Sequence, residues 1–169
     1  WDFVDAQDKL DVTKRTVFPF TIVLDRIRSP FNVGSMFRTS DSFGVEKILL
    51  STPCADVDHP RTKRSAAGCT ESVDWEKLTP AEVLSSIEGK SVFALEVGGT
   101  SIATFDFPDD GVMVVGSEEL GVSPQLLERA KQSLGVVSIP LLGTKGSLNV
   151  STAFSIAMYW WALKKGKLY

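Results

Sequence analysis

The sequence predicts one α/β domain in which a parallel sheet lies between two layers of helices. Short apolar runs recur along the 169 residues at intervals suited to buried strands. Segments that carry helix-start signals separate most of these runs. The 43% hydrophobic and 23% charged content is typical of a globular chain, and the length suits a single domain. Strands that alternate with helices pair in parallel through right-handed crossovers, which place helices on both faces of the sheet.

The strands are predicted from apolar runs of four or five residues, each too short to be a helix. In chain order the runs are FTIVL at 20–24, KILL at 47–50, SVFAL at 91–95, VMVV at 112–115 and VVSI at 136–139.

Helices are predicted between and after these runs. We expect the first to begin with Asn32 as its cap and to end at Gly44. Its shared face consists of Val33, Met36, Phe37, Ser40 and Phe43. Thr79-Pro80 and Ser123-Pro124 each place a cap residue before a proline at the first helical position, so a helix is predicted to follow each pair. The last helix is expected from near Leu148 to about Lys165.

The composition excludes several classes of protein. No apolar stretch is long enough to span a bilayer, because the densest run, 154–163, contains Ser155 and is followed by two lysines. The first ten residues, WDFVDAQDKL, lack the basic and apolar regions of a secretory signal. The two cysteines give no disulfide framework, so we expect a cytoplasmic protein without a membrane partner.

Neither a metal site nor a strong nucleic-acid signal follows from the charged residues. Cys54, His59 and Cys69 have a spacing that matches no zinc site, and no fourth ligand is visible, so no metal is expected. Basic residues cluster at 26–28, 61–64 and 164–167. The net charge is −3, so each cluster alone indicates solvated surface. Only convergence of several clusters on one face would form an RNA-binding surface.

Ligands of open α/β sheets bind beyond the carboxyl ends of the strands, so the loops after 24, 95, 115 and 139 are the candidate site. After the first strand comes DRIRSPFNVGSMFRTSDSFG, in which Arg38 lies off the apolar face of its helix. Arg38 is therefore either an ordinary surface residue or, with Asn32, a group that faces an anionic substrate near a helix start.

Two further loops carry unusual residues. In GSEELGVSP, Gly116 and Gly121 bracket two acids, and Glu118 directly after a buried strand needs a partner if it is buried. The two glycines alone are explained by a turn. In IPLLGTKGSLNVS, Ser147 and Asn149 offer polar groups at a helix start, where several N–H groups lack partners within the helix.

The stretches FNVGSMFRTSDSFG, VVGSEELGVS and IPLLGTKGSLNVSTAFSIAMY resemble, in order and spacing, the three motifs of the SpoU (TrmH-like) ribose methyltransferases of the SPOUT class. The resemblance covers roughly residues 20–165. It implies transfer of a methyl group from S-adenosylmethionine to a ribose 2′-hydroxyl of tRNA or rRNA. It also implies a methyltransferase domain over 20–169, an N-terminal extension over 1–19 and a deep C-terminal trefoil knot, which the general rules of topology would not suggest.

The resemblance also assigns residues. It implies that Arg38 engages the ribose and its phosphate and promotes loss of the hydroxyl proton. A free arginine remains protonated and is a poor base, so it needs activation by its surroundings or a phosphate relay. The other residues implied in catalysis are Asn32, Glu118, Ser147 and Asn149. The residues implied in cofactor binding are Leu95, Glu96, Gly116, Leu120, Ile139, Leu141, Gly143, Ser147 and Leu148.

The last helix predicts a homodimer. Between 148 and 163 its apolar residues fall on nearly every side, whereas a helix on one sheet face needs a single apolar stripe. Trp160 and Trp161 point about 100° apart, so one of them is expected to face away from the sheet. The alternative is that neighbouring elements of the same chain bury both sides. Two alternatives for function stay open: an RNA-binding module of the same fold without methyl transfer, and a small-molecule-binding α/β domain.

Overall fold

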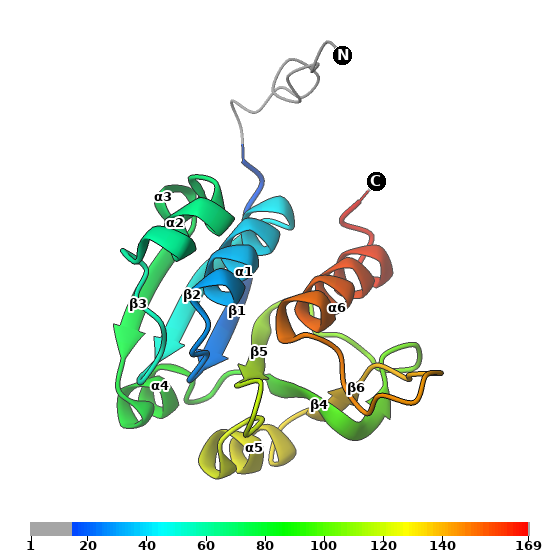
Figure 1. Ribbon diagram of the computed structural model, residues 1–169. Helices are drawn as coiled ribbons and strands as arrows, with labels where there is room; N and C mark the ends of the chain where they lie inside the picture. Colours follow the sequence, from blue (N-terminus) through cyan, green and yellow to red (C-terminus); the bar gives the residue numbers. More distant parts are fainter. Residues whose placement is uncertain (1–14, 169) are drawn as a thin grey trace.

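The computed structural model describes residues 15–168, which form a six-stranded parallel sheet between two helical layers (Figure 1). The strand order is β3-β2-β1-β5-β4-β6, and every pairing is parallel. The strands are β1 (Phe18–Asp25), β2 (Val45–Ser51), β3 (Asp74–Leu78), β4 (Val92–Ser101), β5 (Gly111–Gly116) and β6 (Gly135–Ser138). The helices are α1 (Pro30–Ser42), α2 (Pro60–Ala66), α3 (Cys69–Ser72), α4 (Pro80–Ser86), α5 (Pro124–Lys131) and α6 (Val150–Lys164).

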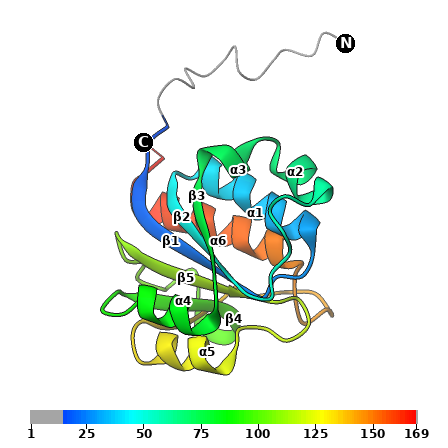
Figure 2. The ribbon, with the colours of Figure 1, turned by 90° about the vertical axis from the view of Figure 1, so that its left-hand side faces the viewer.

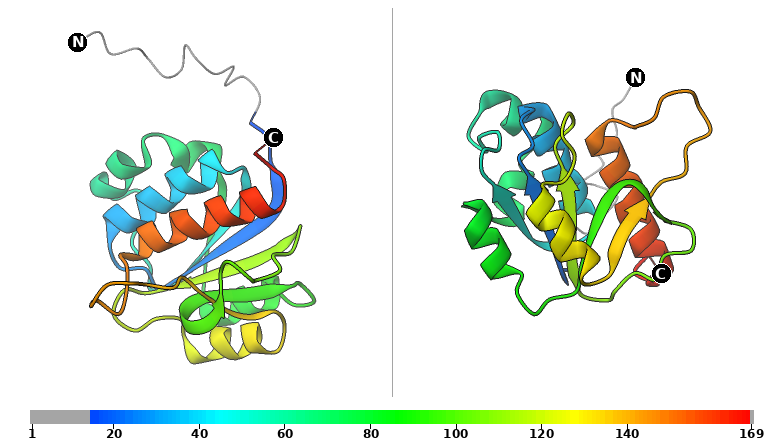
Figure 3. Two further views of the ribbon diagram at one scale, coloured as in Figure 1. Left: turned by 90° about the vertical axis from the view of Figure 1, so that its right-hand side faces the viewer. Right: turned by 90° about the horizontal axis from the view of Figure 1, so that it is seen from below.

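The helices cover both faces of the sheet, as predicted (Figures 2 and 3). Side chains of a strand alternate between faces, so Ile22 and Leu24 of β1 join one apolar cluster while Val23 joins the other. The larger cluster lies under α1 and α6, which run side by side in Figure 3. The smaller cluster lies under α4 and α5.

The five strands predicted from apolar runs are confirmed, and one strand escaped prediction. β3, with the sequence DWEKL, is an edge strand whose only neighbour is β2, and four of its five residues are exposed. A strand that buries so little has no apolar run to reveal it. β1 also begins at Phe18, so the sheet takes in the end of the predicted N-terminal extension.

The predicted start of the first helix was wrong. α1 begins at Pro30, and Ser29 is its N-cap, with the Ser29 side chain accepting from the backbone N–H of Asn32 at 3.3 Å. Ser29-Pro30 is the same cap-and-proline signature that marks the helices after 79 and 123. Asn32 therefore lies within the first turn and is 4% exposed. Its side chain is free to serve the site instead of capping the helix.

The other predicted helices are confirmed. Thr79 and Glu82 form a capping box at the start of α4. Asn149 caps α6, which begins two residues after the predicted position. Ser123 precedes α5 without a side-chain cap bond, and its backbone N–H donates instead to the buried carboxylate of Asp25 at 2.6 Å.

Side chains of α6 contact the sheet and the segment between β4 and β5. Trp161 is fully buried, stacks on Phe20 with ring centroids 4.7 Å apart, and donates from Nε1 to the carbonyl of Pro108. The Lys164 ammonium donates to the carbonyls of Ala103 and Phe105. Lys165 pairs with Asp109 at 3.4 Å. Two of the lysines in the 164–167 cluster are thus engaged within the chain.

From Arg15 to Leu168, no helix combines the length and the apolar character needed to cross a membrane.

Candidate active site

A cavity of about 770 Å³ lies at the carboxyl ends of β5 and β6 and beside the middle of β4, where the pairing of β4 with β6 shifts register after Leu95. The carboxyl end of a parallel sheet is where ligands are expected to bind. β4 contributes Leu95, Glu96 and Val97, and two loops contribute the turn after Gly116 and the segment that leads into α6. The lining residues are Leu95, Glu96, Val97, Val115, Gly116, Ser117, Glu118, Glu119, Leu120, Gly121, Val122, Leu127, Ile139, Leu141, Ser147, Leu148, Asn149, Val150 and Ala153.

The turn from Ser117 to Gly121 forms one wall of this cavity. Backbone hydrogen bonds run in both directions between these two residues, at 3.2 and 2.9 Å, and the Ser117 hydroxyl accepts from the N–H of Leu120. Gly121 has φ +68°, which favours glycine. At Gly116 a Cβ would lie 2.2 Å from backbone atoms of Gly121 and Val122, so no side chain fits there. The close return of the chain explains both glycines.

Glu96, which lies within β4, joins this strand to the turn. Its carboxylate accepts from the N–H of Val122 at 3.1 Å and from the N–H of Val97 at 3.0 Å. The same carboxylate lies against Gly121, where a Cβ would come within 2.4 Å of Oε2. Glu96 therefore fixes the distance between β4 and the turn after β5.

A chain of side-chain hydrogen bonds joins the three sequence motifs. Asn32 Nδ2 donates to Glu118 Oε1 at 2.5 Å, and Asn149 Nδ2 donates to Asn32 Oδ1 at 3.4 Å. Asn149 Oδ1 in turn accepts from the backbone N–H groups of Ser151 and Thr152. The start of α1, the turn after β5 and the start of α6 are thus held together through three polar residues.

The position of Glu118 directly after a buried strand suggested a buried carboxylate, which would need a partner. Its side chain is instead exposed, so it has no desolvation penalty to offset. The buried member of the chain of hydrogen bonds is Asn32, and both ends of its amide are satisfied. A buried amide left without partners would cost free energy, so its partners hold Asn32 in one orientation.

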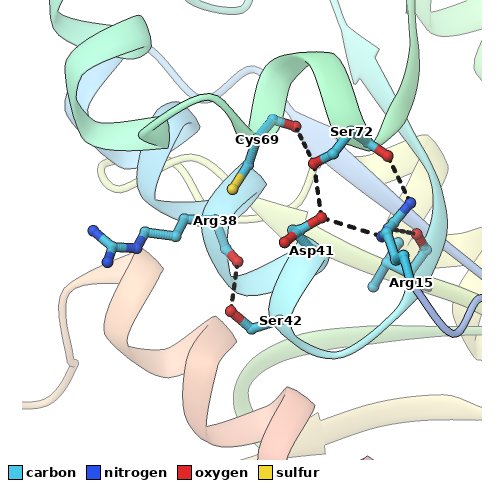
Figure 4. Close-up of polar contacts among 7 residues, drawn as sticks. Arg15, Arg38, Asp41, Ser42, Cys69 and Ser72 are labelled. Atoms are coloured by element: carbon cyan, nitrogen blue, oxygen red, sulfur yellow. Dashed lines mark hydrogen bonds and ion pairs between the residues drawn. The ribbon is translucent and has the colours of Figure 1, made fainter. Parts of the chain in front are cut away.

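Arg38 is exposed on the outward side of α1. In Figure 4 its side chain extends away from the neighbouring cluster of polar contacts, and no residue between 15 and 168 pairs with its guanidinium group. The cluster beside it contains Arg15, which pairs with Asp41 at 3.2 Å and donates to the carbonyls of Ser72 and Val45. Ser72 donates to the same Asp41 carboxylate. These contacts anchor the last turn of α1 and leave Arg38 free.

A second cavity, of about 400 Å³, adjoins the first. The residues from Ser117 to Leu120 line both, so the turn after β5 forms the wall between them. The second cavity is completed by Arg28, Ser29 and Asn32. Arg28 and Glu119 form an ion pair of 3.8 Å at its rim, and both side chains are more than 70% exposed.

The structure gathers most of the residues suggested by the sequence. Glu118, Ser147 and Asn149 line the larger cavity, Asn32 lines the smaller, and Arg38 lines neither. Of the suggested cofactor residues, Leu95, Glu96, Gly116, Leu120, Ile139, Leu141, Ser147 and Leu148 line the larger cavity.

The exception is Gly143. It is exposed and lies outside the lining, and a Cβ there would meet nothing within 4 Å. Gly143 is therefore the one suggested cofactor residue that does not line this cavity, and its contact with the cofactor stays a prediction.

Several lining residues were not singled out in the sequence, among them Val97, Ser117 and Val122. Val97 lies within β4, whereas Ser117 and Val122 belong to the turn after β5, so their positions close to the predicted strand ends at 95 and 115 were the available signal. Arg28 was noted only as part of a basic cluster. Its position three residues after the carboxyl end of β1 places it at the rim of the second cavity.

The residues considered for a metal have other roles. His59 is the N-cap of α2, where Nδ1 accepts from the N–H of Arg61 at 3.1 Å. Burial raises the pKa of the Cys54 thiol to about 12, so Cys54 is a poor ligand and nucleophile. Burial also raises the pKa of the Cys69 thiol. Over the described range 15–168, no three His, Cys, Asp or Glu side chains are grouped to hold a metal ion.

Comparison with known proteins agrees with this arrangement. Residues 19–159 match the model of the SpoU rRNA Methylase family, and this range includes all three loops. The chain is 30% identical over 146 residues to the 23S rRNA (guanosine-2'-O-)-methyltransferase RlmB of Acinetobacter baylyi, a match that covers 82% of this chain and 57% of the relative. Across two curated relatives that it matches, the chain spans 50% and 63% of their length.

Two solved structures have the same fold. The SpoU methyltransferase AviRb of Streptomyces viridochromogenes, in complex with AdoMet, superposes with a TM-score of 0.77 and 26% identity, over 92% of this chain and 62% of that one. A structure that concerns 2-OH methylation of C/U34 on tRNA superposes with a TM-score of 0.78 and 25% identity, over 88% of this chain and 98% of that one.

Proposed function

The chain belongs to the SpoU rRNA Methylase family, and we propose that it transfers a methyl group from S-adenosylmethionine to a ribose 2′-hydroxyl of RNA. The observation that carries this proposal is the link from Glu118 through Asn32 to Asn149 at the junction of the two cavities. It joins the three family motifs at the place where a cofactor in one cavity and a nucleotide in the other would meet.

The larger cavity suits the cofactor. Its volume of about 770 Å³ lies within the roughly 300–1,000 Å³ typical of small-molecule sites. Leu95, Ile139 and Leu141 offer apolar walls for the adenine. When bound, S-adenosylmethionine supplies an electrophilic methyl group on a sulfonium. The remaining task of the protein is to position the acceptor hydroxyl.

We assign that positioning to polar residues of the second cavity and of α1. Asn32 and Glu118 would orient the acceptor ribose, since both line the second cavity. Arg38 would bind the adjacent phosphate, because its guanidinium is exposed and free of partners within 15–168. A protonated arginine cannot accept the hydroxyl proton, so that proton would pass to a phosphate oxygen. Ser147 would act from the third loop, at the edge of the cofactor cavity.

We further propose two features of the family for this chain. The segment from Ile139 to Asn149 would thread a trefoil knot, which is supported by its course from β6 at the edge of the sheet to α6 against the central strand. A second copy would cover the exposed side of α6. Tyr159 is 49% exposed and Leu163 37% exposed there, although Trp161 and the contacts of α6 with α1 are already buried within one chain.

The substrate is proposed to be rRNA, with tRNA as the second candidate. The curated relative named above, RlmB of Acinetobacter baylyi, is a 23S rRNA methyltransferase, as its name states. The tRNA candidate is favoured by a different observation, since the structure concerned with C/U34 of tRNA is matched over almost its whole length. We place the reaction in the cytoplasm.

The first experiment separates catalysis from RNA binding alone. Binding of S-adenosylmethionine is measured by calorimetry, and transfer of a radiolabelled methyl group is measured on RNA from cells that lack the protein. We expect binding at one site per chain and transfer to rRNA, with protection of one 2′-position from alkaline cleavage. A chain that binds RNA but neither binds the cofactor nor transfers a methyl group would be an RNA-binding module, and the proposal would be wrong.

A further inference from the structure

Phe31 is a large aromatic residue that the chain leaves uncovered. It lies in the first turn of α1 and is 60% exposed. None of the ring pairs formed within residues 15–168 includes it, although most other phenylalanines take part in such pairs. Ser29 and Asn32, on either side of it in sequence, line the second cavity. An exposed ring at the edge of a polar cavity is a typical platform for a nucleobase.

The outward side of α1 forms a continuous stripe that begins at this ring. Phe31, Ser35, Arg38 and Ser42 are spaced by four, three and four residues, so they share one side of the helix. The opposite side, with Val33, Met36 and Phe37, is buried against the sheet. Phe31 and Arg38 are seven residues apart, which corresponds to about 10 Å along the helix axis. Two neighbouring nucleotides can bridge this distance.

Two helices lie beside α1. On one side α2 approaches closely, since a Cβ at Gly34 would lie 2.0 Å from Ser65 Oγ. On the other side α6 packs through the Thr39–Ser155 contact of 2.9 Å and the Phe43–Tyr159 ring pair. Figure 2 shows α1 between these two helices. The stripe is thus the part of α1 that neither helix covers.

The charges on and beside the outward side of α1 favour RNA. Arg38 has no partner within residues 15–168, and α2, which packs on α1, carries exposed Arg61 and Arg64. Arg38 favours a phosphate at its position on the stripe, and the cations of α2 add positive charge to this side of the molecule. Near Phe31 the acids Glu118 and Glu119 repel phosphate but can accept hydrogen bonds from base amino and imino groups.

We propose that Phe31 stacks on a nucleobase next to the methylated nucleotide and that the single-stranded RNA runs from this ring along the outward stripe of α1 to Arg38. This inference rests on the proposed function, since it takes the RNA substrate as given. Phe31 is a positioning residue here: it would hold the strand so that the acceptor ribose lies against Asn32 and Arg38.

The test compares four variants in binding and in transfer. Phe31→Ala is expected to weaken binding of a labelled single-stranded 12-nucleotide RNA at least about fivefold, the lower end of what one stacked base contributes. Phe31→Trp should keep the affinity, whereas Phe31→Leu, which is apolar but cannot stack, should not. Leu134→Ala is the matched control, because Leu134 is 39% exposed and distant in sequence from all three loops. S-adenosylmethionine affinity and thermal midpoint should be unchanged in all four.

A spectroscopic signature makes the stacking visible. Fluorescence of the tryptophan in Phe31→Trp should be quenched by the 12-nucleotide RNA and not by an abasic oligomer of the same length. Wild-type affinity in Phe31→Ala, equal recovery in Phe31→Leu and Phe31→Trp, or a change of molecular mass in Phe31→Ala would each overturn the inference. If the wild type transfers methyl groups and substitution of Phe31 has no effect on RNA binding, this inference alone is wrong. If RNA binding depends on Phe31 but the wild type transfers no methyl group, the proposed function alone is wrong.

Discussion

Arg38 and Asn32 lie on the same helix, but they differ in burial and in their hydrogen bonds to the rest of the chain. Asn32 is 4% exposed, and both ends of its amide are bonded to residues of other loops. Arg38 is exposed, and within 15–168 nothing pairs with its guanidinium. Substitution of Asn32 therefore disturbs the framework of the site as well as its chemistry. Substitution of Arg38 removes a group on which the fold does not depend.

Arg38→Ala is accordingly expected to abolish methyl transfer while the thermal midpoint stays within about a degree, since exposed residues without partners contribute within about 0.5 kcal/mol. The measurements are radiolabelled transfer to RNA and differential scanning calorimetry. Lys131→Ala removes one positive charge from an exposed position on α5, in the other helical layer, and should keep most of the activity. A large loss of stability in Arg38→Ala, with activity kept by the folded fraction, would contradict the assignment.

Asn149 has two tasks that can be separated by substitution. Its Oδ1 caps α6, and its Nδ2 donates to Asn32. Asn149→Ala should cost about 0.5–2 kcal/mol of unfolding free energy through loss of the cap. Asn149→Asp caps equally well but has no donor for Asn32, so it should restore most of the stability and little of the transfer rate. Urea denaturation and kcat measure the two effects. Recovery of both in Asn149→Asp would mean that the cap is its only role.

Substitutions at two glycines test separately whether the turn after β5 and the loop after β6 shape the cofactor site. At Gly116 a Cβ would lie 2.2 Å from the returning backbone, whereas at Gly143 it would meet nothing. Gly116→Ala should therefore displace the cavity wall and weaken S-adenosylmethionine binding at least tenfold. Gly143→Ala is the matched control and should bind normally. Calorimetry of both variants measures this, and equal affinities would show that the turn does not shape the cofactor site.

The strands and helices were predictable where burial or capping leaves a local signal. Five strands have apolar runs because both of their faces are covered, whereas β3, at the edge, has none. The Ser29-Pro30 pair marks the true start of α1. Asn32 is also a residue type that caps helices, so the sequence contained two possible start signals. Helices α2 and α3 have seven and four residues, which is too short for an apolar period to be recognised.

The site was predictable only in part. Loop position and resemblance to a family indicated Glu96 and Asn149, but not that Glu96 accepts from Val122 or that Asn149 donates to Asn32. These bonds join residues 26 and 117 positions apart, and no local pattern encodes them. That Gly143 lies outside the lining was not predictable for the same reason, since the course of a loop depends on what it packs against.

Considered as a whole, the molecule has one helical layer that carries both the proposed chemistry and the proposed assembly. α1 bears Asn32 and Arg38, and α6 lies beside it and bears Asn149 at its start. The exposed surface of α6 includes Tyr159 and Leu163. A second copy seated on α6 would therefore lie next to the active site and could contribute to it.

We expect light scattering at low micromolar concentration to give twice the chain mass of 18.4 kDa. Leu163→Asp places a charge on the exposed side of α6 and should shift the mass towards the monomer, because a buried unpaired carboxylate is costly at an interface. Leu134→Asp, at a residue of similar exposure before β6, should leave the dimer intact. If each site draws on both subunits, the Leu163→Asp monomer should stay folded by circular dichroism and lose methyl transfer. Mixtures of Arg38→Ala and Asn149→Ala subunits should then regain part of the activity. A wild-type monomer that methylates RNA at this concentration would show that one chain is sufficient.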